Sequence, residues 1–199
     1  MEAFSSKKLH SFLFIVLAYS SIISPAQATE RPYQEASTQF IRTSCSTTTY
    51  PRLCFSSLAK HASFIQTNRV LLTGTSLNVS LDSAKATSFL MSTLSKRLGM
   101  KPREIAAMKD CVEEISESVD ELRRSIDEMG HLRNSNFDVT MNDVQTWVSA
   151  ALTDENTCAD GFQGTNGNVK TTVRGRIVQV AQMTSNALAL INQLASFHG

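Results

Sequence analysis

The sequence predicts an all-α protein: an up-down-up-down four-helix bundle, preceded by an N-terminal helical hairpin and tied by two disulfides. Three observations lead to this fold class. Past residue 75, apolar residues recur in steps of three and four along four long stretches, and no stretch shows the strict alternation of a strand. Amphipathic helices on short connections bury their apolar stripes most simply as a bundle. The chain also contains four cysteines, an even number.

The first 28 residues are expected to be a secretory signal peptide. Lys7 and Lys8 form a short positive region, residues 12–23 are mostly apolar, and Ala26-Gln27-Ala28 is a small-x-small cleavage site. The apolar run is shorter than a helix that spans a bilayer, which disfavours the alternative of a transmembrane anchor. We therefore expect a protein secreted to the extracellular space, without a membrane anchor after cleavage, whose mature domain covers residues 29–199.

Residues 34–73 predict a helical hairpin ahead of the bundle. Phe40-Ile41 closes one short segment, and Pro51 opens another, because proline suits a first helical turn. The apolar residues of the second segment are Leu53, Leu58, Ala62, Ile65 and Leu72. We expect this hairpin to pack on the bundle or to extend from it.

The bundle is expected to span residues 76–196. Ser76 is the expected N-cap of its first helix, and Gly99 lies where a helix usually stops. The second helix should run from Pro102 to Gly130, since proline suits its start and glycine its end. Its apolar stripe is Ile105, Met108, Val112, Ile115, Val119, Leu122, Ile126 and Met129.

The third and fourth helices are separated by a loop. The third should begin near Asp138, with Trp147 beside its apolar stripe, and the fourth carries apolar residues from Val173 to Leu194. The stripe of the third helix is Met141, Val144, Val148, Ala151 and Cys158. Residues 159–168 are rich in Gly and Asn and predict a loop. Its glycines could suggest phosphate binding, but their G-x-x-G-x-x-G spacing and the lack of a preceding strand favour a linker.

Helix geometry pairs the four cysteines, which in a secreted protein are expected to form disulfides. Cys111 and Cys158 lie roughly 28 and 30 Å from the turn between the second and third helices, so antiparallel neighbours bring them level. Cys45 and Cys54 are nine residues apart across turn-forming residues, which makes a local bridge easy. Of the three possible pairings we predict Cys45–Cys54 and Cys111–Cys158.

Charge is balanced over the whole chain but unevenly placed. The net charge is +1, yet residues 31–103 hold ten basic and two acidic side chains, while residues 104–160 hold four basic and fourteen acidic ones. The second and third helices therefore present an acidic surface, which suits a basic protein partner and does not suit nucleic acid. The alternative interpretation is a solvated acidic face without a partner.

Catalytic and metal-binding motifs are not found in the sequence. It contains no G-x-S-x-G and no H-E-x-x-H motif, and its acidic pairs fall on the polar face of the second helix, where solvation is the commoner role. Metal binding is disfavoured because no Cys-x-x-Cys occurs and His61, His131 and His198 are scattered. We expect no enzymatic activity, no cofactor and no metal.

Asn78-Val79-Ser80 is the one N-x-S/T sequon in the chain. In a secreted protein, Asn78 is a candidate for N-glycosylation. The sequon falls early in the first bundle helix, which leaves its occupancy open.

The segments around the four cysteines resemble one known family. They read FIRTSC at residues 40–45, TYPRLC at 49–54, MKDC at 108–111, and WVSAALT at 147–153 leading into TC at 157–158. This chain resembles the plant invertase/pectin methylesterase inhibitor family over essentially all of its mature length. The resemblance implies a disulfide-tied hairpin before a four-helix bundle, in agreement with the pairing above. It also implies a monomeric enzyme inhibitor of the plant apoplast or cell wall.

The family contains inhibitors of two unrelated enzymes. Invertase inhibitors commonly carry Pro-Lys-Phe just before the third bundle helix, where this chain has NSNFD at residues 134–138. The missing Pro-Lys, and the likeness of residues 147–153 to the pectin methylesterase side of the family, favour inhibition of pectin methylesterase. We expect a reversible one-to-one complex that occludes the pectin-binding cleft. The alternatives are inhibition of acid invertase and a non-inhibitory extracellular binding module.

Family analogy places the partner-binding surface on the second, third and fourth bundle helices. From the outward positions of the second and third helices we expect contacts from Glu114, Glu117, Asp120, Glu121, Asn142, Gln145, Thr146 and Ser149. Carboxylates at such a surface make affinity depend on pH and salt.

Overall fold

The structure is a computed structural model that describes residues 25–96, 99–165 and 168–197, and within these ranges it contains helices and no strand. The helices are α2 (Pro25–Cys45), α3 (Pro51–Leu58), α4 (Ala62–Ile65), α5 (Arg69–Ser95), α6 (Pro102–Gly130), α7 (Phe137–Gly161) and α8 (Asn168–Ser196). Two short 3₁₀ turns, η1 (Ala59–His61) and η2 (Asn134–Asn136), join them. Residues 1–24 of the expected signal peptide lie outside the described residues. In the described part of the chain, no helix is both long enough and apolar enough to cross a membrane.

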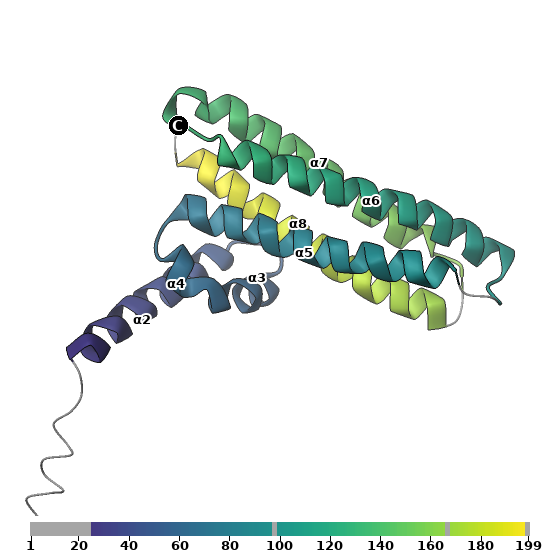
Figure 1. Cartoon of the computed structure of the whole chain (residues 1–199), viewed down its shortest axis with the longest axis horizontal. Helices are drawn as coiled ribbons and strands as arrows, with labels where there is room; N and C mark the ends of the chain where they lie inside the picture. The colour runs from purple at the N-terminus through teal and green to yellow at the C-terminus, as the bar shows by residue number, and fades with distance from the viewer. Residues whose placement is uncertain (1–24, 97–98, 166–167, 198–199) are drawn as a thin grey trace, which may run out of the picture.

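Helices α5 to α8 form an elongated four-helix bundle (Figure 1). Each helix packs on the next one along the chain, and α8 closes the ring against α5. Figure 1 also shows α3 and α4 against the α5 and α8 side of the bundle, with the N-terminal end of α2 pointing away. The all-α bundle that the sequence predicts is therefore confirmed.

The bundle core is formed by the apolar stripes of its four helices. Side chains with no exposed surface come from every helix, including Leu77, Ile115, Val148 and Ile177. The stripe of α6 is buried at Met108, Ile115 and Leu122, each at 1% exposure or less. Helix α6 has the predicted bounds, and Glu104 accepts a bond from the Lys101 N–H at 2.9 Å at its start. A carboxylate in the first turn suits the positive end of the helix dipole.

Helix α5 begins seven residues earlier than Ser76, the expected N-cap. Asn68 caps the helix instead, since its side chain accepts a bond from the Leu71 N–H at 3.0 Å. Ser76 lies inside the helix, buried, and its hydroxyl donates to the Thr73 carbonyl at 2.7 Å. Hydroxyls that bond back to the preceding turn allow a segment rich in Ser and Thr to be both helical and buried. Leu72, expected in the hairpin, therefore belongs to α5.

The loop between the third and fourth bundle helices is shorter than predicted. Helix α7 continues to Gly161, so residues 159–161 are helical, and α8 begins at Asn168. Phe162 follows with no exposed surface, and Thr165 is also buried. The prediction of a loop over residues 159–168 was wrong at both ends, and at the first end the cause is that Ala159 and Phe162 pack in the bundle core.

The hairpin has a small core of its own. Ile41, Cys54, Leu58 and Ile65 are at most 2% exposed, and they form a cluster that meets the bundle at Leu72 and Leu190. The cluster lies between α2, α3 and α4 on one side and α5 and α8 on the other. The hairpin therefore packs on the bundle rather than extending from it.

Two disulfides are present. Cys45–Cys54 joins the end of α2 to α3, with a Cα–Cα distance of 5.6 Å, and Cys111–Cys158 joins α6 to α7, with a Cα–Cα distance of 4.4 Å. This is the pairing that helix geometry predicts.

Candidate partner-binding surface on the bundle

The eight residues expected to bind a partner fall into an exposed group and a half-buried group. Exposed are Glu117 and Asp120 on α6 and Asn142, Thr146 and Ser149 on α7. Half-buried are Glu114, Glu121 and Gln145. The structure therefore leaves five of the eight side chains facing solvent and turns three toward a neighbouring helix.

The exposed residues of α7 form a narrow polar stripe. Asn142, Thr146, Ser149 and Thr153 follow each other in steps of four and three, so they share one face of the helix. The Thr146 hydroxyl donates to the Asn142 carbonyl at 2.8 Å, and the Thr153 hydroxyl donates to the Ser149 carbonyl at 2.9 Å. These bonds hold the short side chains close to the helix, which leaves a flat surface that still offers hydrogen-bond acceptors.

Gln145 connects this stripe to α8. Its amide nitrogen donates to the Asn192 side-chain oxygen at 2.8 Å, and Asn192 is exposed. The polar surface thus continues from α7 onto α8, and Gln145 is held by this bond instead of pointing freely outward.

An acidic junction, defined here as Glu114, Glu117 and Glu121 of α6 with Asp154 of α7, lies where these two helices meet. Burial, and then the neighbouring Asp154, raise the pKa of Glu121 to about 7. Burial also raises the pKa of Asp154, and burial followed by the charges of Asp154 and Glu117 raises the pKa of Glu114. With both carboxyls ionised, the buried oxygens Glu121 Oε2 and Asp154 Oδ2 receive no hydrogen bond from a donor among the described residues. Since the two carboxyls lie within hydrogen-bonding reach of each other, they can share a proton.

Three carboxylates of the acidic junction lie close together. One oxygen each from Glu114, Glu117 and Asp154 lies within 4.8 Å of the other two, close enough for one cation to touch all three. Glu117 is exposed and the other two are half-buried. Solvated acidic groups of this kind need no ion, so the arrangement carries no metal assignment.

Trp147 borders the acidic junction on α7. Its ring faces Arg124 of α6, whose guanidinium carbon lies 4.8 Å from the ring centroid. A cation over an indole face is attracted by the ring quadrupole. Arg124 thus places a positive charge beside the acidic junction, where it lowers the pKa of Glu121 and opposes the effect of burial.

Sequence reasoning missed a fully buried carboxyl, Glu155. It has no exposed surface, and its Oε1 accepts bonds from the hydroxyls of Ser118 at 2.7 Å and Thr184 at 2.9 Å. Burial raises the pKa of Glu155 to about 8, although the two hydrogen bonds lower it, because the effect of burial is the larger one. A signal was present, because position 155 lies between Ala151 and Cys158 on the predicted core stripe of the third helix.

Asp154 was missed as well, although the disulfide register locates it. Glu114 is three residues after Cys111, and Asp154 is four residues before Cys158. In antiparallel helices that are level at this bridge, the two carboxylates must face each other. The predicted pairing therefore already contained the information that places Asp154 beside Glu114.

Comparison with known proteins identifies the family. The model of the plant invertase/pectin methylesterase inhibitor family matches residues 39–190. The chain is 43% identical over 203 residues to a 21 kDa protein of Daucus carota, covering 100% of this chain and 99% of the relative. It is 44% identical over 197 residues to pectinesterase inhibitor 9 of Arabidopsis thaliana, covering 94% of this chain and 96% of the relative.

A solved structure shares the fold. The crystal structure of mutant form A of a pectin methylesterase inhibitor from Arabidopsis superposes with a TM-score of 0.62 at 22% sequence identity, over 74% of this chain and 92% of that chain. At this identity the likeness concerns the fold alone. The family match over most of the chain, with the two relatives aligned nearly end to end, leads to one conclusion: the chain belongs to the plant invertase/pectin methylesterase inhibitor family and is an enzyme inhibitor rather than an enzyme.

Proposed function

We propose that this protein inhibits pectin methylesterase through a reversible one-to-one complex that occludes the pectin-binding cleft and so modulates pectin methylesterification in the cell wall. The observation that carries the proposal is the family membership together with full-length relatives named as pectinesterase inhibitors. The turn before α7 supports the choice of target, since residues 134–136 form η2 with the sequence NSN and lack the Pro-Lys expected of an invertase inhibitor.

The proposed contact surface is the outer face of α6 and α7. Its exposed members are Glu117, Asp120, Asn142, Thr146 and Ser149, and the bond from Gln145 to Asn192 extends it onto α8. Negative charge on α6 attracts a basic enzyme surface and speeds the encounter, while the small polar side chains of α7 allow close approach. Glu114 and Glu121 lie behind this surface, where burial raises the pKa of both, so the negative charge at the acidic junction decreases as pH falls.

We also propose that the protein works as a secreted monomer in the extracellular space of the plant. The charge pattern of residues 1–28, the two disulfides and the match to the family support this location. Disulfides persist in oxidising compartments such as the secretory pathway and the extracellular space.

A titration tests the proposed function. Oxidised protein is added in increasing amounts to a plant pectin methylesterase at mildly acidic and neutral pH, and to an acid invertase in parallel. We expect loss of methylesterase activity that is complete near one equivalent, with invertase unaffected. Loss of invertase activity alone would show that the target is the other enzyme of the family, and loss of neither would indicate a non-inhibitory binding module.

A further inference from the structure

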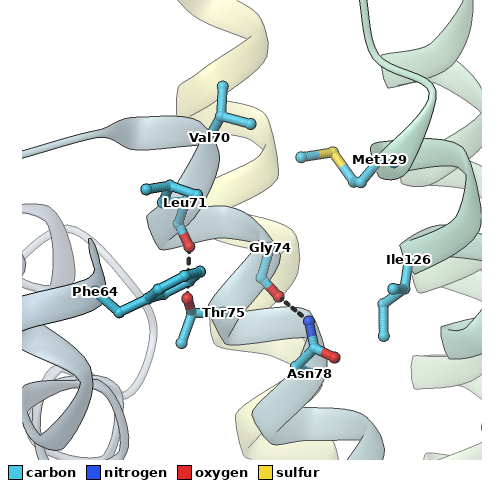
Figure 2. Close-up of a pocket in the computed structure, with 9 residues that line it drawn as sticks. Phe64, Val70, Leu71, Gly74, Thr75, Asn78, Ile126 and Met129 are labelled. Atoms are coloured by element: carbon cyan, nitrogen blue, oxygen red, sulfur yellow. Dashed lines mark hydrogen bonds between the residues drawn. The ribbon is translucent and has the colours of Figure 1, made fainter. Parts of the chain in front are cut away.

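An apolar pocket of about 230 Å³ opens between the start of α5 and the end of α6 (Figure 2). Phe64, Val70 and Gly74 line it from α4 and α5, and Ile126 and Met129 line it from α6. Phe64 is 61% exposed and Val70 is 39% exposed, so the walls are apolar and open to solvent. The pocket therefore offers apolar surface on which a ligand or a covalent modification can pack.

Asn78, the asparagine of the only sequon, also lines this pocket. Its side chain is exposed, and Nδ2 donates to the Gly74 carbonyl at 2.8 Å. Figure 2 shows Asn78 one helical turn from Gly74, with Phe64 on one side and Ile126 on the other. The one atom of the chain that an N-glycan would be bonded to thus lies at the wall of an uncovered apolar pocket.

We propose that Asn78 carries an N-linked glycan and that its first N-acetylglucosamine covers this pocket. This inference shares one requirement with the proposed function, namely that the chain enters the secretory pathway. It does not depend on which enzyme is inhibited, because the pocket involves none of the residues of the proposed contact surface.

The modification is a glycosyl transfer with a balanced outcome. Asn78 Nδ2 forms a bond to C1 of the sugar, while the bond from C1 to a lipid-linked diphosphate breaks. The diphosphate is the leaving group, and Nδ2 gives up one of its two protons. The glycosylated amide keeps its other N–H, so the bond to the Gly74 carbonyl can persist.

Transfer must come before folding. Asn78 lies inside α5, and the sequon hydroxyl of Ser80 is 1% exposed in the folded chain. A glycosyltransferase can reach both groups only while the segment is unfolded, as it is on entry into the secretory pathway. Folding of α5 then brings the sugar over the pocket.

The pocket offers what one sugar ring needs. One face of N-acetylglucosamine carries C–H groups that pack on the electron-rich face of an aromatic ring such as that of Phe64. Thr75 also lines the pocket, and its hydroxyl already donates to the Leu71 carbonyl at 2.6 Å, so it does not need a sugar hydroxyl as an acceptor. Since pockets for drug-sized ligands run to about 300–1,000 Å³, a smaller cavity suits a single sugar with its hydroxyls turned to solvent.

The test compares three forms of the protein secreted from a eukaryotic host with its own leader. One keeps the whole glycan, one is trimmed by an endoglycosidase to a single N-acetylglucosamine, and one is the variant Asn78→Gln, which keeps an amide but cannot be glycosylated. We expect peptide mass spectrometry to find the sugar on Asn78. We expect the single-sugar form to melt about 2–4 °C above Asn78→Gln and close to the fully glycosylated form.

Two matched variants test whether the sugar lies on the pocket. Phe64→Ala should abolish the difference in melting temperature between the single-sugar form and its Asn78→Gln counterpart. Phe89→Ala, a change at a 77% exposed residue of α5 that does not line the pocket, should leave the difference intact. An unmodified Asn78 in protein recovered from the medium would overturn the proposal, whatever the protein inhibits. If Asn78 is modified but the single sugar adds no stability, the sugar does not cover the pocket. If the sugar adds the same stability in Phe64→Ala as in wild type, it does not pack on Phe64. Either result would overturn the proposed coverage of the pocket and point to another occupant.

Discussion

Glu155 shows how one residue can make the stability of the bundle depend on pH. Its carboxyl has no exposed surface, and two hydroxyls donate to Oε1, while Oε2 has no hydrogen-bond partner among the described residues. This arrangement suits the protonated form, in which Oε2 carries the proton. Burial accordingly raises the pKa of Glu155 from 4.5 to about 8.

The sign of the pH dependence follows from this pKa. Between pH 4.5 and about 8 the folded protein holds a proton at Glu155 that the unfolded chain has lost, so stability falls as pH rises through this range. We expect the free energy of unfolding to fall on the order of 2–4 kcal/mol between pH 5 and 8. Glu155→Gln keeps the acceptor for Ser118 and Thr184 but cannot ionise, so it should lose less stability over the same range.

Denaturant unfolding at pH 5 and pH 8 measures this difference. Part of the dependence should remain in Glu155→Gln because Glu121, with a pKa of about 7, contributes in the same direction. Equal slopes for wild type and Glu155→Gln would show that Glu155 does not titrate in this range.

Glu117 and Asp120 test the proposed contact surface. Both are exposed on α6, and Asp120 forms an ion pair with Arg123 that is itself exposed and worth little to stability. The double variant Glu117→Lys/Asp120→Lys should slow association with pectin methylesterase by about tenfold or more at low salt, and by less at high salt, because steering by charge is screened.

Association kinetics measured by surface binding check this expectation. Asp82→Lys, a charge reversal at an exposed residue of α5 outside the proposed surface, is the matched control and should associate like wild type. Unchanged kinetics in a folded Glu117→Lys/Asp120→Lys variant would remove these residues from the interface.

At the scale of single elements, two glycines weaken the helices in which they lie. Gly74 in α5 and Gly175 in α8 are interior helical positions, and a Cβ added at either would meet no described atom within 4 Å. Gly74→Ala and Gly175→Ala should each stabilise the protein by about 0.5–1 kcal/mol, because alanine loses less backbone entropy in a helix.

The control is a third glycine. Gly164 has a φ of +78°, and a Cβ there would lie 3.3 Å from Arg103 Nη2, so Gly164→Ala should destabilise. Thermal melts of the three variants measure the effects, and a destabilised Gly175→Ala would contradict the account of helix propensity.

Asn186 is a buried side chain of α8 that bonds the backbone of the hairpin, beside the more exposed bonds that Gln193 donates to Ser44 and Thr47. Asn186 is buried, its Oδ1 accepts a bond from the Tyr50 N–H at 3.0 Å, and its Nδ2 donates to the Tyr50 carbonyl at 3.1 Å. Asn186→Ala leaves both backbone groups of Tyr50 without these partners and should destabilise by about 1–3 kcal/mol. Hydrogen exchange should speed up in α3 more than in α6.

Asn192 provides a comparison for Asn186. It is also an asparagine of α8, but it is exposed and bonds the Gln145 side chain rather than the hairpin. Asn192→Ala should leave exchange in α3 unchanged. If both variants accelerate α3 equally, the bonds to Tyr50 are not what holds the hairpin.

At the scale of the whole molecule, the two disulfides constrain the unfolded chain to different degrees. Cys111–Cys158 closes a loop with a sequence separation of 47, and Cys45–Cys54 closes one of 9. Because the loss of unfolded-state entropy grows with loop length, Cys111→Ser/Cys158→Ser should destabilise by about 4 kcal/mol and Cys45→Ser/Cys54→Ser by about 2–3 kcal/mol. Urea unfolding of the two double variants ranks them, and the reverse order would mean that native packing outweighs chain entropy here.

How far the fold follows from the sequence depends on the kind of residue at each position. Helix α6 was predicted end to end because Pro102, Gly130 and an unbroken apolar stripe agree with one another. The start of α5 was missed because its buried face includes Thr73, Thr75 and Ser76, which are polar in the sequence. The hydroxyls of Thr75 and Ser76 are satisfied by bonds within the helix, which a sequence pattern does not show.

The candidate site shows the same division. Outward positions on α6 and α7 follow from helical period, which is why Glu117, Asp120 and Ser149 are exposed as expected. Glu121 is half-buried because its surroundings depend on Asp154 of another helix, a fact that a single helix cannot reveal. Glu155 was missed because an ionisable residue is assigned to the surface unless its partners are known.

The separation of the two apolar cores has a consequence for how the molecule opens. The hairpin cluster meets the bundle at Leu72 and Leu190, and Cys45–Cys54 closes within the hairpin without tying it to the bundle. We therefore expect the hairpin to open at lower free energy than the bundle, as a unit that its own disulfide keeps together. Because the Cys45–Cys54 bridge is local, it preserves the shape of the hairpin during such an opening without limiting how far the hairpin moves from α5 and α8.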